Sequence, residues 1–407
     1  MSMEHTSTVH PDRTTWSVIA GGIVALAVAM GIGRFAFTPL MPLMLRDGTL
    51  STAAGAEWAA ANYGGYLVGA LTASWFSKDP LRGMRLALLG VALTTLAAAW
   101  TSGGSTALVG AGLRATAGVF SAWVLVCASS WCLAELARRQ APRLGAWIYT
   151  GVGLGIALAG SFAWLGGRQP ATWLWLELGL IALAGAVLVG LGLQDRSMAS
   201  ASAGTQASSP ATPSAKHGHL ALVLCYGVSG FGYIVPATFL PAMAQQQFPD
   251  PLVFGLTWPL FGLAAALSVA AAARWLSGWS RRRVWALAHG TMALGTALPL
   301  ATQALWALAA SAVLVGGTFM VATMAGLQLA REQAPANPTP LLARMTVAFA
   351  AGQIAGPLLV RALGPDSWAG WDALAWANAT ATALLVLTMA WLWHDAKHSY
   401  SPLRQFR

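Results

Sequence analysis

Twelve apolar segments follow one another along the chain, and this pattern limits the fold more than any other feature. About 20 apolar residues in a helix span the hydrocarbon core of a bilayer, and the segments have roughly 16–30 residues each. They cover residues 16–45, 53–76, 86–101, 105–134, 144–165, 172–193, 219–243, 252–273, 284–302, 305–330, 341–363 and 372–393. Helices satisfy their own backbone hydrogen bonds in lipid. The pattern therefore predicts an all-α integral membrane protein with twelve transmembrane helices.

The composition supports a lipid environment. The 407 residues are 57% hydrophobic and 9% charged, whereas soluble domains carry about 25% charged residues. The three cysteines, Cys127, Cys132 and Cys225, lie within apolar runs, so we expect free thiols. The first 15 residues are polar and have no signal-peptide cleavage site.

The net charge of +10 is a topology signal more than a sign of nucleic-acid binding. With the N-terminus inside, 18 of the 23 Lys and Arg residues fall in inner loops and tails, three fall outside, and two lie within spans. The three outer residues are Arg46, Arg168 and Arg361. Positive charge concentrates on the cytoplasmic side of membrane proteins. The distribution predicts that both termini are cytoplasmic.

A polar stretch divides the spans into two sets of six. Residues 194–218 are rich in Ala, Ser, Thr and Pro and lack apolar periodicity, which is typical of a flexible linker. We therefore expect five parts, namely an N-terminal tail, a first bundle, a cytoplasmic linker, a second bundle and a C-terminal tail. Their predicted ranges are 1–15, 16–193, 194–218, 219–393 and 394–407.

The two halves resemble each other in sequence. Three residues of the first span recur in the seventh at an offset of 199, which places Tyr233 opposite Arg34. The fourth span ends LARRQAP (136–142) and the tenth ends LAREQAP (329–335), at an offset of 193. Parallel six-span repeats are typical of transporters that move two bundles about a site at mid-membrane. We therefore expect two pseudo-symmetric bundles.

Several stretches resemble one known family. GIGRFAFTPLMPLM (31–44), ANYGGYLVGA (61–70) and GFGYIVPATFLPAMA (230–244) are similar to the YbfB/YjiJ-like branch of the major facilitator superfamily, as are WPLFGLAAA (258–266) and GQIAGP (352–357). The resemblance covers nearly all of the chain except the tails and linker. It implies the superfamily fold, with spans one, four, seven and ten lining a central cavity, and a monomer in the bacterial inner membrane.

Two departures from the superfamily pattern limit what the resemblance implies. The loop between spans two and three usually resembles G-x-x-x-D-R-x-G-R-R, but here it reads GALTASWFSKDPLRGMR (69–85), with Asp79 and Arg82 displaced. The fifth span also lacks the Gly-Pro pair of drug/proton antiporters. These departures weaken the usual gating role of that Asp and disfavour multidrug antiport.

Two arginines lie at mid-depth within apolar spans. Arg34 follows Trp16 by about 18 residues, or roughly 27 Å of helix, and Arg114 lies at a similar depth in the fourth span. None of the 13 acidic residues is clearly at this level. Charges at such depth are costly and usually functional. We expect Arg34 and Arg114 to bind an anionic substrate; the alternative is that they bond to helix carbonyls freed near Gly31, Gly33 and Pro39.

Other polar residues complete the predicted site. Tyr233, Tyr66, Gln353 and Asn62 are further candidate substrate-binding residues, since each can bond a ligand or a neighbouring helix. For proton coupling the candidates are Arg114, through its resemblance to a fourth-span superfamily motif, and Glu177 and Glu57. His289 is interpreted as a packed histidine. Helix gating is assigned to the residues Gly31, Gly33, Pro39, Pro42, Gly230, Gly232, Pro236 and Pro241, where the prolines kink or end the outer part of each span.

The sequence favours a secondary carrier. Metalloprotease, nucleophile-elbow and P-loop motifs are absent, so we expect no enzyme activity, no cofactor, no metal and no nucleotide-driven pumping. The predicted function is transport of a small organic anion by alternating access, with protons or a counter-anion as partner. Two alternatives stay open: an efflux carrier for hydrophobic compounds or sugars, and a non-transporting membrane sensor or scaffold.

Overall fold

The computed structural model describes residues 13–76, 79–101, 106–193, 216–248, 250–276, 278–334, 339–364 and 368–398. The N-terminal half contains α1 Arg13–Leu26, η1 Ala27–Arg34, α2 Phe37–Arg46, α3 Thr52–Phe76, α4 Pro80–Ala98, α5 Thr106–Arg138, η2 Pro142–Tyr149, α6 Thr150–Leu165 and α7 Ala171–Gly192. The C-terminal half contains α8 Lys216–Gln247, α9 Pro251–Phe254, α10 Thr257–Trp275, α11 Arg281–Ala301, α12 Leu305–Gln333, α13 Thr339–Leu363 and α14 Ala373–His398. The predicted linker lies outside the described residues up to residue 215, and α8 begins within its predicted range.

Eleven helices in the described ranges are long and apolar enough to cross a membrane. The predicted second span forms a helix, α3, but this helix is not among the eleven. It carries Glu57, Asn62 and two tyrosines between glycines and alanines, which makes it less apolar than its neighbours. The prediction of an all-α membrane protein is confirmed, and the count of spans by apolar length is eleven.

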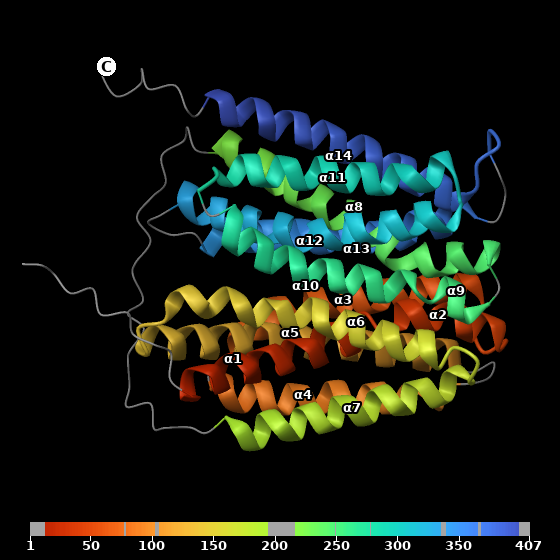
Figure 1. Cartoon of the computed structure of the whole chain (residues 1–407), viewed down its shortest axis with the longest axis horizontal. Helices are drawn as coiled ribbons and strands as arrows, with labels where there is room; N and C mark the ends of the chain where they lie inside the picture. Colours follow the sequence, from red (N-terminus) through yellow and green to blue (C-terminus); the bar gives the residue numbers. More distant parts are fainter. Residues whose placement is uncertain are drawn as a thin grey trace, which may run out of the picture.

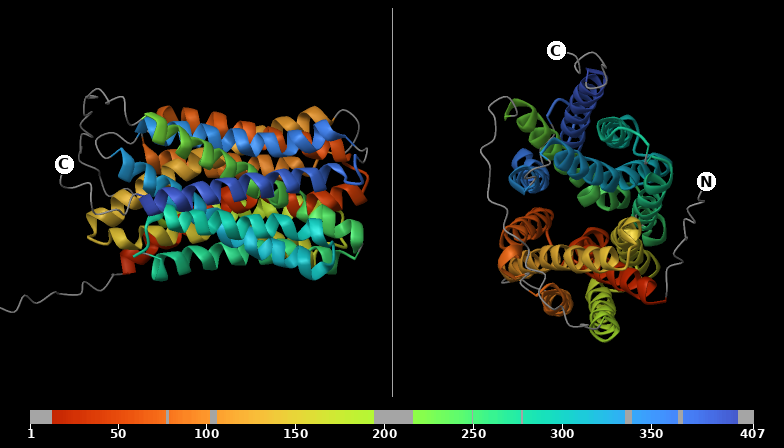
Figure 2. Two further views of the ribbon diagram at one scale, coloured as in Figure 1. Left: turned by 90° about the horizontal axis from the view of Figure 1, so that it is seen from above. Right: turned by 90° about the vertical axis from the view of Figure 1, so that its left-hand side faces the viewer.

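The helices form two groups that lie side by side. Figure 1 shows α1 to α7 in one group and α8 to α14 in the other, with the long helices running roughly along the same axis. Figure 2 shows the same division when the molecule is viewed along the helices. We call the end of the molecule where Arg13 and His398 lie the termini end. The opposite end, with the turns after Arg46 and Leu165, is the far end.

The two halves meet along two helix pairs, α6 with α10 and α3 with α13. Glycine allows the first pair to approach closely. A Cβ atom on Gly262 of α10 would lie 2.2 Å from the Ala157 backbone nitrogen, and one on Gly153 of α6 would lie 2.3 Å from the Ala266 nitrogen. Small residues let membrane helices pack backbone to backbone in this way.

The predicted proline breaks differ between the two halves. The first span is divided at Phe35 and Ala36, where a π-helical segment, η1, ends and α2 begins. In the seventh span, α8 remains one helix from Lys216 to Gln247 although it contains Pro236 and Pro241. A helix can retain a proline in a membrane bundle because neighbouring groups satisfy the carbonyl that the proline leaves free. The three cysteines are free and buried, as predicted.

Candidate functional site

Arg34 is the last residue of the π-helix η1, and this local geometry determines where its side chain lies. The Phe35 amide donates to the Met30 carbonyl oxygen, five residues back, at 3.1 Å. Such segments occur often at functional sites. Glycine is required at position 31 of η1, since a Cβ atom there would lie 2.2 Å from the Gly155 carbonyl carbon on α6. The close contact with α6 therefore holds the widened turn in place.

Arg114 stabilises this widened turn from α5. Its Nη1 donates to the Gly33 carbonyl oxygen at 3.1 Å, and its Nη2 donates to the Arg34 carbonyl oxygen at 2.7 Å. Asn62 Nδ2 donates in turn to the Arg114 carbonyl oxygen at 2.8 Å. The guanidinium of Arg114 thus satisfies carbonyls that the helix leaves free. These bonds to helix carbonyls are the alternative that the sequence left open for Arg114.

The guanidinium of Arg34 has a different environment. The residue is only 4% exposed, and its Cζ lies 3.9 Å from the centroid of the Tyr66 ring. Its Nη2 donates to the Tyr233 hydroxyl at 3.4 Å, across the boundary between the halves. In the described part of the chain, the ion pairs all join other residues. The positive charge of Arg34 is therefore balanced by aromatic faces and a hydroxyl, without a carboxylate.

Tyr233 connects Arg34 to the C-terminal half. Gln353 Nε2 donates to the same Tyr233 hydroxyl, and the Tyr233 ring stacks on Phe319 and Phe349, with centroids 5.0 and 5.7 Å apart. Four buried polar atoms here have no hydrogen-bond partner among the described residues: Arg34 Nε, Arg114 Nε, Asn62 Oδ1 and Gln353 Oε1. Buried polar groups are rarely left unpaired, so this site retains capacity to bond a ligand or water.

The structure brings together the six residues predicted to bind substrate, and it adds residues that the sequence reasoning missed. The Tyr63 hydroxyl lies 3.0 Å from Thr238 Oγ1, which makes a second polar contact between the halves. Ser121 Oγ donates to the Ala29 carbonyl oxygen at 2.7 Å. Tyr63 stands between two predicted residues, so its place in the second span was a usable signal. Thr238 and Ser121 gave no such signal, because threonine and serine are common within membrane helices.

The acidic residues predicted to carry protons, Glu57 and Glu177, lie on α3 and α7. Glu57 Oε1 is 2.9 Å from Arg361 Nη1, in an exposed ion pair between α3 and α13 at the far end. Glu177 is partly buried on α7. Asp79, the displaced loop residue, accepts a hydrogen bond from the Arg82 amide at 3.1 Å and caps α4. The role of Glu57 and Glu177 in proton coupling stays a prediction.

His289 is packed within the C-terminal half, as interpreted from the sequence. Trp285 Nε1 donates to its Nε2 at 2.9 Å, and its Nδ1 lies 2.8 Å from Thr388 Oγ1. The described ranges contain no cluster of His, Cys, Asp and Glu that could hold a metal ion. Among the described residues, the buried arginines are Arg34 and Arg114.

Comparison with known proteins gives the family. A family model described as "Uncharacterised MFS-type transporter YbfB" matches residues 26–394. The chain belongs to this family of the major facilitator superfamily. It is a multi-pass membrane transporter of small molecules, and not an enzyme. No curated protein sequence matches the chain.

Solved transporters share the fold of this family member at low sequence identity. The nucleoside transporter NupG has a TM-score of 0.67 at 14% identity, over 96% of this chain and 100% of the other. The xylose transporter XylE from E. coli has a TM-score of 0.67 at 13% identity, over 94% and 98%. The POT family transporter PepTSo has a TM-score of 0.68 at 13% identity, over 96% and 98%.

Several polar contacts between the halves of this transporter lie from mid-depth to the far end. Beyond Arg34–Tyr233 and Tyr63–Thr238, they include Gln245 Nε2 to the Pro42 carbonyl oxygen at 3.1 Å, Trp164 Nε1 to the Leu252 carbonyl oxygen at 2.8 Å, and Arg361–Glu57. At the termini end, by contrast, the ion pair Arg281–Glu332 joins helices of one half. The halves are thus held together toward the far end.

Proposed function

We propose that this protein is a secondary carrier of a small organic anion that works by alternating access around Arg34. The observation that carries the proposal is the environment of Arg34, a buried guanidinium at the boundary between the halves with no carboxylate partner in the described part of the chain. An arginine presents a planar set of donors that suits a carboxylate or phosphate. An anion bound there would supply the missing counter-charge.

The proposed mechanism divides the work between the two buried arginines. Arg34 binds the anion together with Tyr66, Tyr233, Gln353 and Asn62, whereas Arg114 holds the π-helix that presents Arg34. Because Arg34 bonds to Tyr233 of the other half, an anion that competes for its donors weakens one link between the halves. Binding is thereby coupled to movement of the two bundles.

The proposed topology follows from the same arrangement. The basic loops lie at the termini end, so we place both termini in the cytoplasm of a bacterium and assign α3 as a twelfth span. The far end then faces outward, and the contacts between the halves there correspond to a state closed to the outside. We further propose that the carrier acts as a monomer. Coupling to protons would use Glu57 or Glu177, whereas anion exchange would require neither.

A neutral sugar or hydrophobic compound is the second candidate, because aromatic rings surround the site. Tyr66, Tyr233, Phe319 and Phe349 lie around Arg34 or Tyr233, and the free ends of the Asn62 and Gln353 amides could bond hydroxyl groups. In this case Arg34 would be a structural residue, and its substitution would leave binding intact.

A ligand screen on purified protein distinguishes these functions. A ligand that binds only the native state raises the unfolding temperature, and the effect grows with the ratio of ligand concentration to Kd. We expect small carboxylates or phosphate esters to stabilise the wild type, and Arg34→Ala to lose that stabilisation and the uptake of the same anion in liposomes. Arg168→Ala, at an exposed loop arginine, is the matched control. Stabilisation by sugars or neutral amphiphiles alone, unchanged in Arg34→Ala, would refute the proposal.

A further inference from the structure

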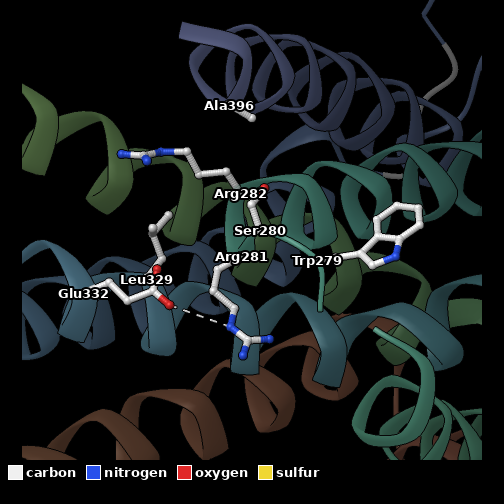
Figure 3. Close-up of a pocket in the computed structure, with 7 residues that line it drawn as sticks. All are labelled: Trp279, Ser280, Arg281, Arg282, Leu329, Glu332 and Ala396. Carbon is white, nitrogen blue, oxygen red and sulfur yellow. Dashed lines mark ion pairs between the residues drawn. The ribbon is translucent and has the colours of Figure 1, made fainter. Parts of the chain in front are cut away.

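A cavity lies at the termini end of the C-terminal half, away from the Arg34 site. It has a volume of about 290 Å³ and lies where α11 begins and where α12 and α14 end. Its lining includes Trp279, Arg281, Arg282 and Glu332. Figure 3 shows the Arg281 side chain directed toward Glu332, with Trp279 at the other edge of the pocket. The transport mechanism proposed above does not use this cavity.

The charged residues that line the cavity are two arginines, Arg281 and Arg282, and one carboxylate, Glu332. Arg281 Nε lies 3.7 Å from Glu332 Oε1, and the Arg281 and Glu332 side chains are 30% and 56% exposed. An exposed pair at this distance is weak, so the Arg281 guanidinium has donors to offer to a second anion. Arg282 Nε lies 2.6 Å from Asp395 Oδ2. Arg283 and Arg274 add two further cations to the same stretch of sequence.

The flanking tryptophans indicate the depth of the cavity in a membrane. Trp275 is 73% exposed at the end of α10, and Trp279 is 48% exposed just before α11 begins. Tryptophans at the ends of membrane helices lie at the level of the lipid headgroups. Trp279 lines the cavity, so the cavity opens near the layer where lipid phosphates lie, on the side of the basic loops.

We propose that this cavity binds the phosphate of an anionic phospholipid headgroup. Basic pockets between membrane helices are suited to such headgroups. Arg281 is the phosphate ligand, and Trp279 packs beside the lipid. Glu332 competes with the phosphate for Arg281, so the two charges have opposite effects on affinity. The ligand is a phosphate-bearing anion, which could come from a lipid or from solution.

The experiment uses the full chain in phosphatidylcholine nanodiscs with and without phosphatidylglycerol. Native mass spectrometry then counts the lipid molecules that stay bound after the protein is released from the nanodisc. Arg281→Gln should weaken phosphatidylglycerol binding about five-fold, which corresponds to about 1 kcal/mol per arginine at a membrane surface. Glu332→Gln should strengthen it, because the competing carboxylate is lost. Arg344→Gln, at an exposed arginine of the same end, should leave binding unchanged.

The opposite signs of the two variants separate binding from folding, since a damaged fold would weaken binding in both. A decrease in both variants, or an equal decrease in Arg344→Gln, would overturn the proposal. A second arm titrates inorganic phosphate against the wild type and Arg281→Gln in phosphatidylcholine alone. If inorganic phosphate stabilises the wild type as much as phosphatidylglycerol does, and Arg281→Gln loses this effect, the ligand of the cavity is a soluble anion. This result would overturn the lipid as its ligand. If Arg281→Gln does not fold, the Glu332→Gln result decides.

Discussion

The two buried arginines are expected to respond differently to the same substitution, methionine, which keeps much of the length and removes the charge. Arg114→Met leaves the carbonyl oxygens of Gly33 and Arg34 without their donor. An unpaired buried acceptor costs about 1–3 kcal/mol, so the two together cost about 2–6 kcal/mol. Arg34→Met leaves no carbonyl oxygen without its hydrogen-bond donor, and the Tyr233 hydroxyl still accepts a hydrogen bond from Gln353.

Comparing the two variants with each other removes the largest uncertain contribution to the change in unfolding free energy, which is the desolvation of a guanidinium. Both substitutions relieve the cost of burying a guanidinium, and this relief cancels because Arg114 and Arg34 are 3% and 4% exposed. Both variants also lose cation–π contacts. The contact of Arg34 with Tyr66, at 3.9 Å, is worth about 1–2 kcal/mol, whereas Arg114 lies farther from its rings, at 5.4 Å from Phe37 and 5.8 Å from Trp175. The mid-values leave Arg114→Met less stable than Arg34→Met by about 2–3 kcal/mol.

Thermal unfolding of the purified variants, followed by tryptophan fluorescence, measures this difference. We expect Arg114→Met to have a Tm several degrees below that of Arg34→Met. Arg34→Met should stay close to the wild type in stability and lose binding of the anion found by ligand screening. Equal Tm values, or a lower Tm for Arg34→Met, would refute the division of roles between the two arginines.

Two further predictions concern the contacts between the halves. Glu57→Gln removes an exposed ion pair with Arg361 worth about 0–1 kcal/mol, so the Tm should change little. A cysteine placed at Gln245 should then react with a thiol reagent added at the far end up to about five-fold faster. An unchanged labelling rate would argue against a gate there. Gly262→Val places a side chain where a Cβ atom would lie 2.2 Å from the Ala157 nitrogen, and such overpacking lowers stability by about 1–3 kcal/mol or more. The control Gly190→Val, where a Cβ atom would have no neighbour within 4 Å, should keep the wild-type Tm. Equal effects of the two substitutions on the Tm would contradict the close contact of α6 with α10.

Much of the site could be predicted from local sequence and internal symmetry. The offset of 199 residues placed Tyr233 opposite Arg34, and the structure joins these two side chains by a hydrogen bond. Depth along a helix follows from a fixed rise per residue, so the burial of Arg34 and Arg114 could be estimated by counting. Asn62 and Tyr66 lie one helical turn apart, which placed them on one face.

The partners of each polar group could not be predicted in the same way. The two arginines look alike in sequence, yet Arg114 bonds to carbonyls and Arg34 to aromatic rings and a hydroxyl. The difference arises because η1 is a π-helix, and its hydrogen-bond register depends on the contact of Gly31 with Gly155 on α6. The Glu57–Arg361 pair depends on α3 meeting α13. Neither contact leaves a periodic signal in the chain.

The sequence by itself determined that the chain crosses a membrane as helices and that it is built of two related halves with buried cations between them. These properties follow from the free energy of placing each residue in lipid or in water, which depends on composition and on position along a helix. Only the tertiary structure decided which arginine bonds to backbone carbonyls and which one bonds to a hydroxyl of the other half. That choice depends on which helices meet, because a buried charge is satisfied by the groups that packing brings within hydrogen-bond distance.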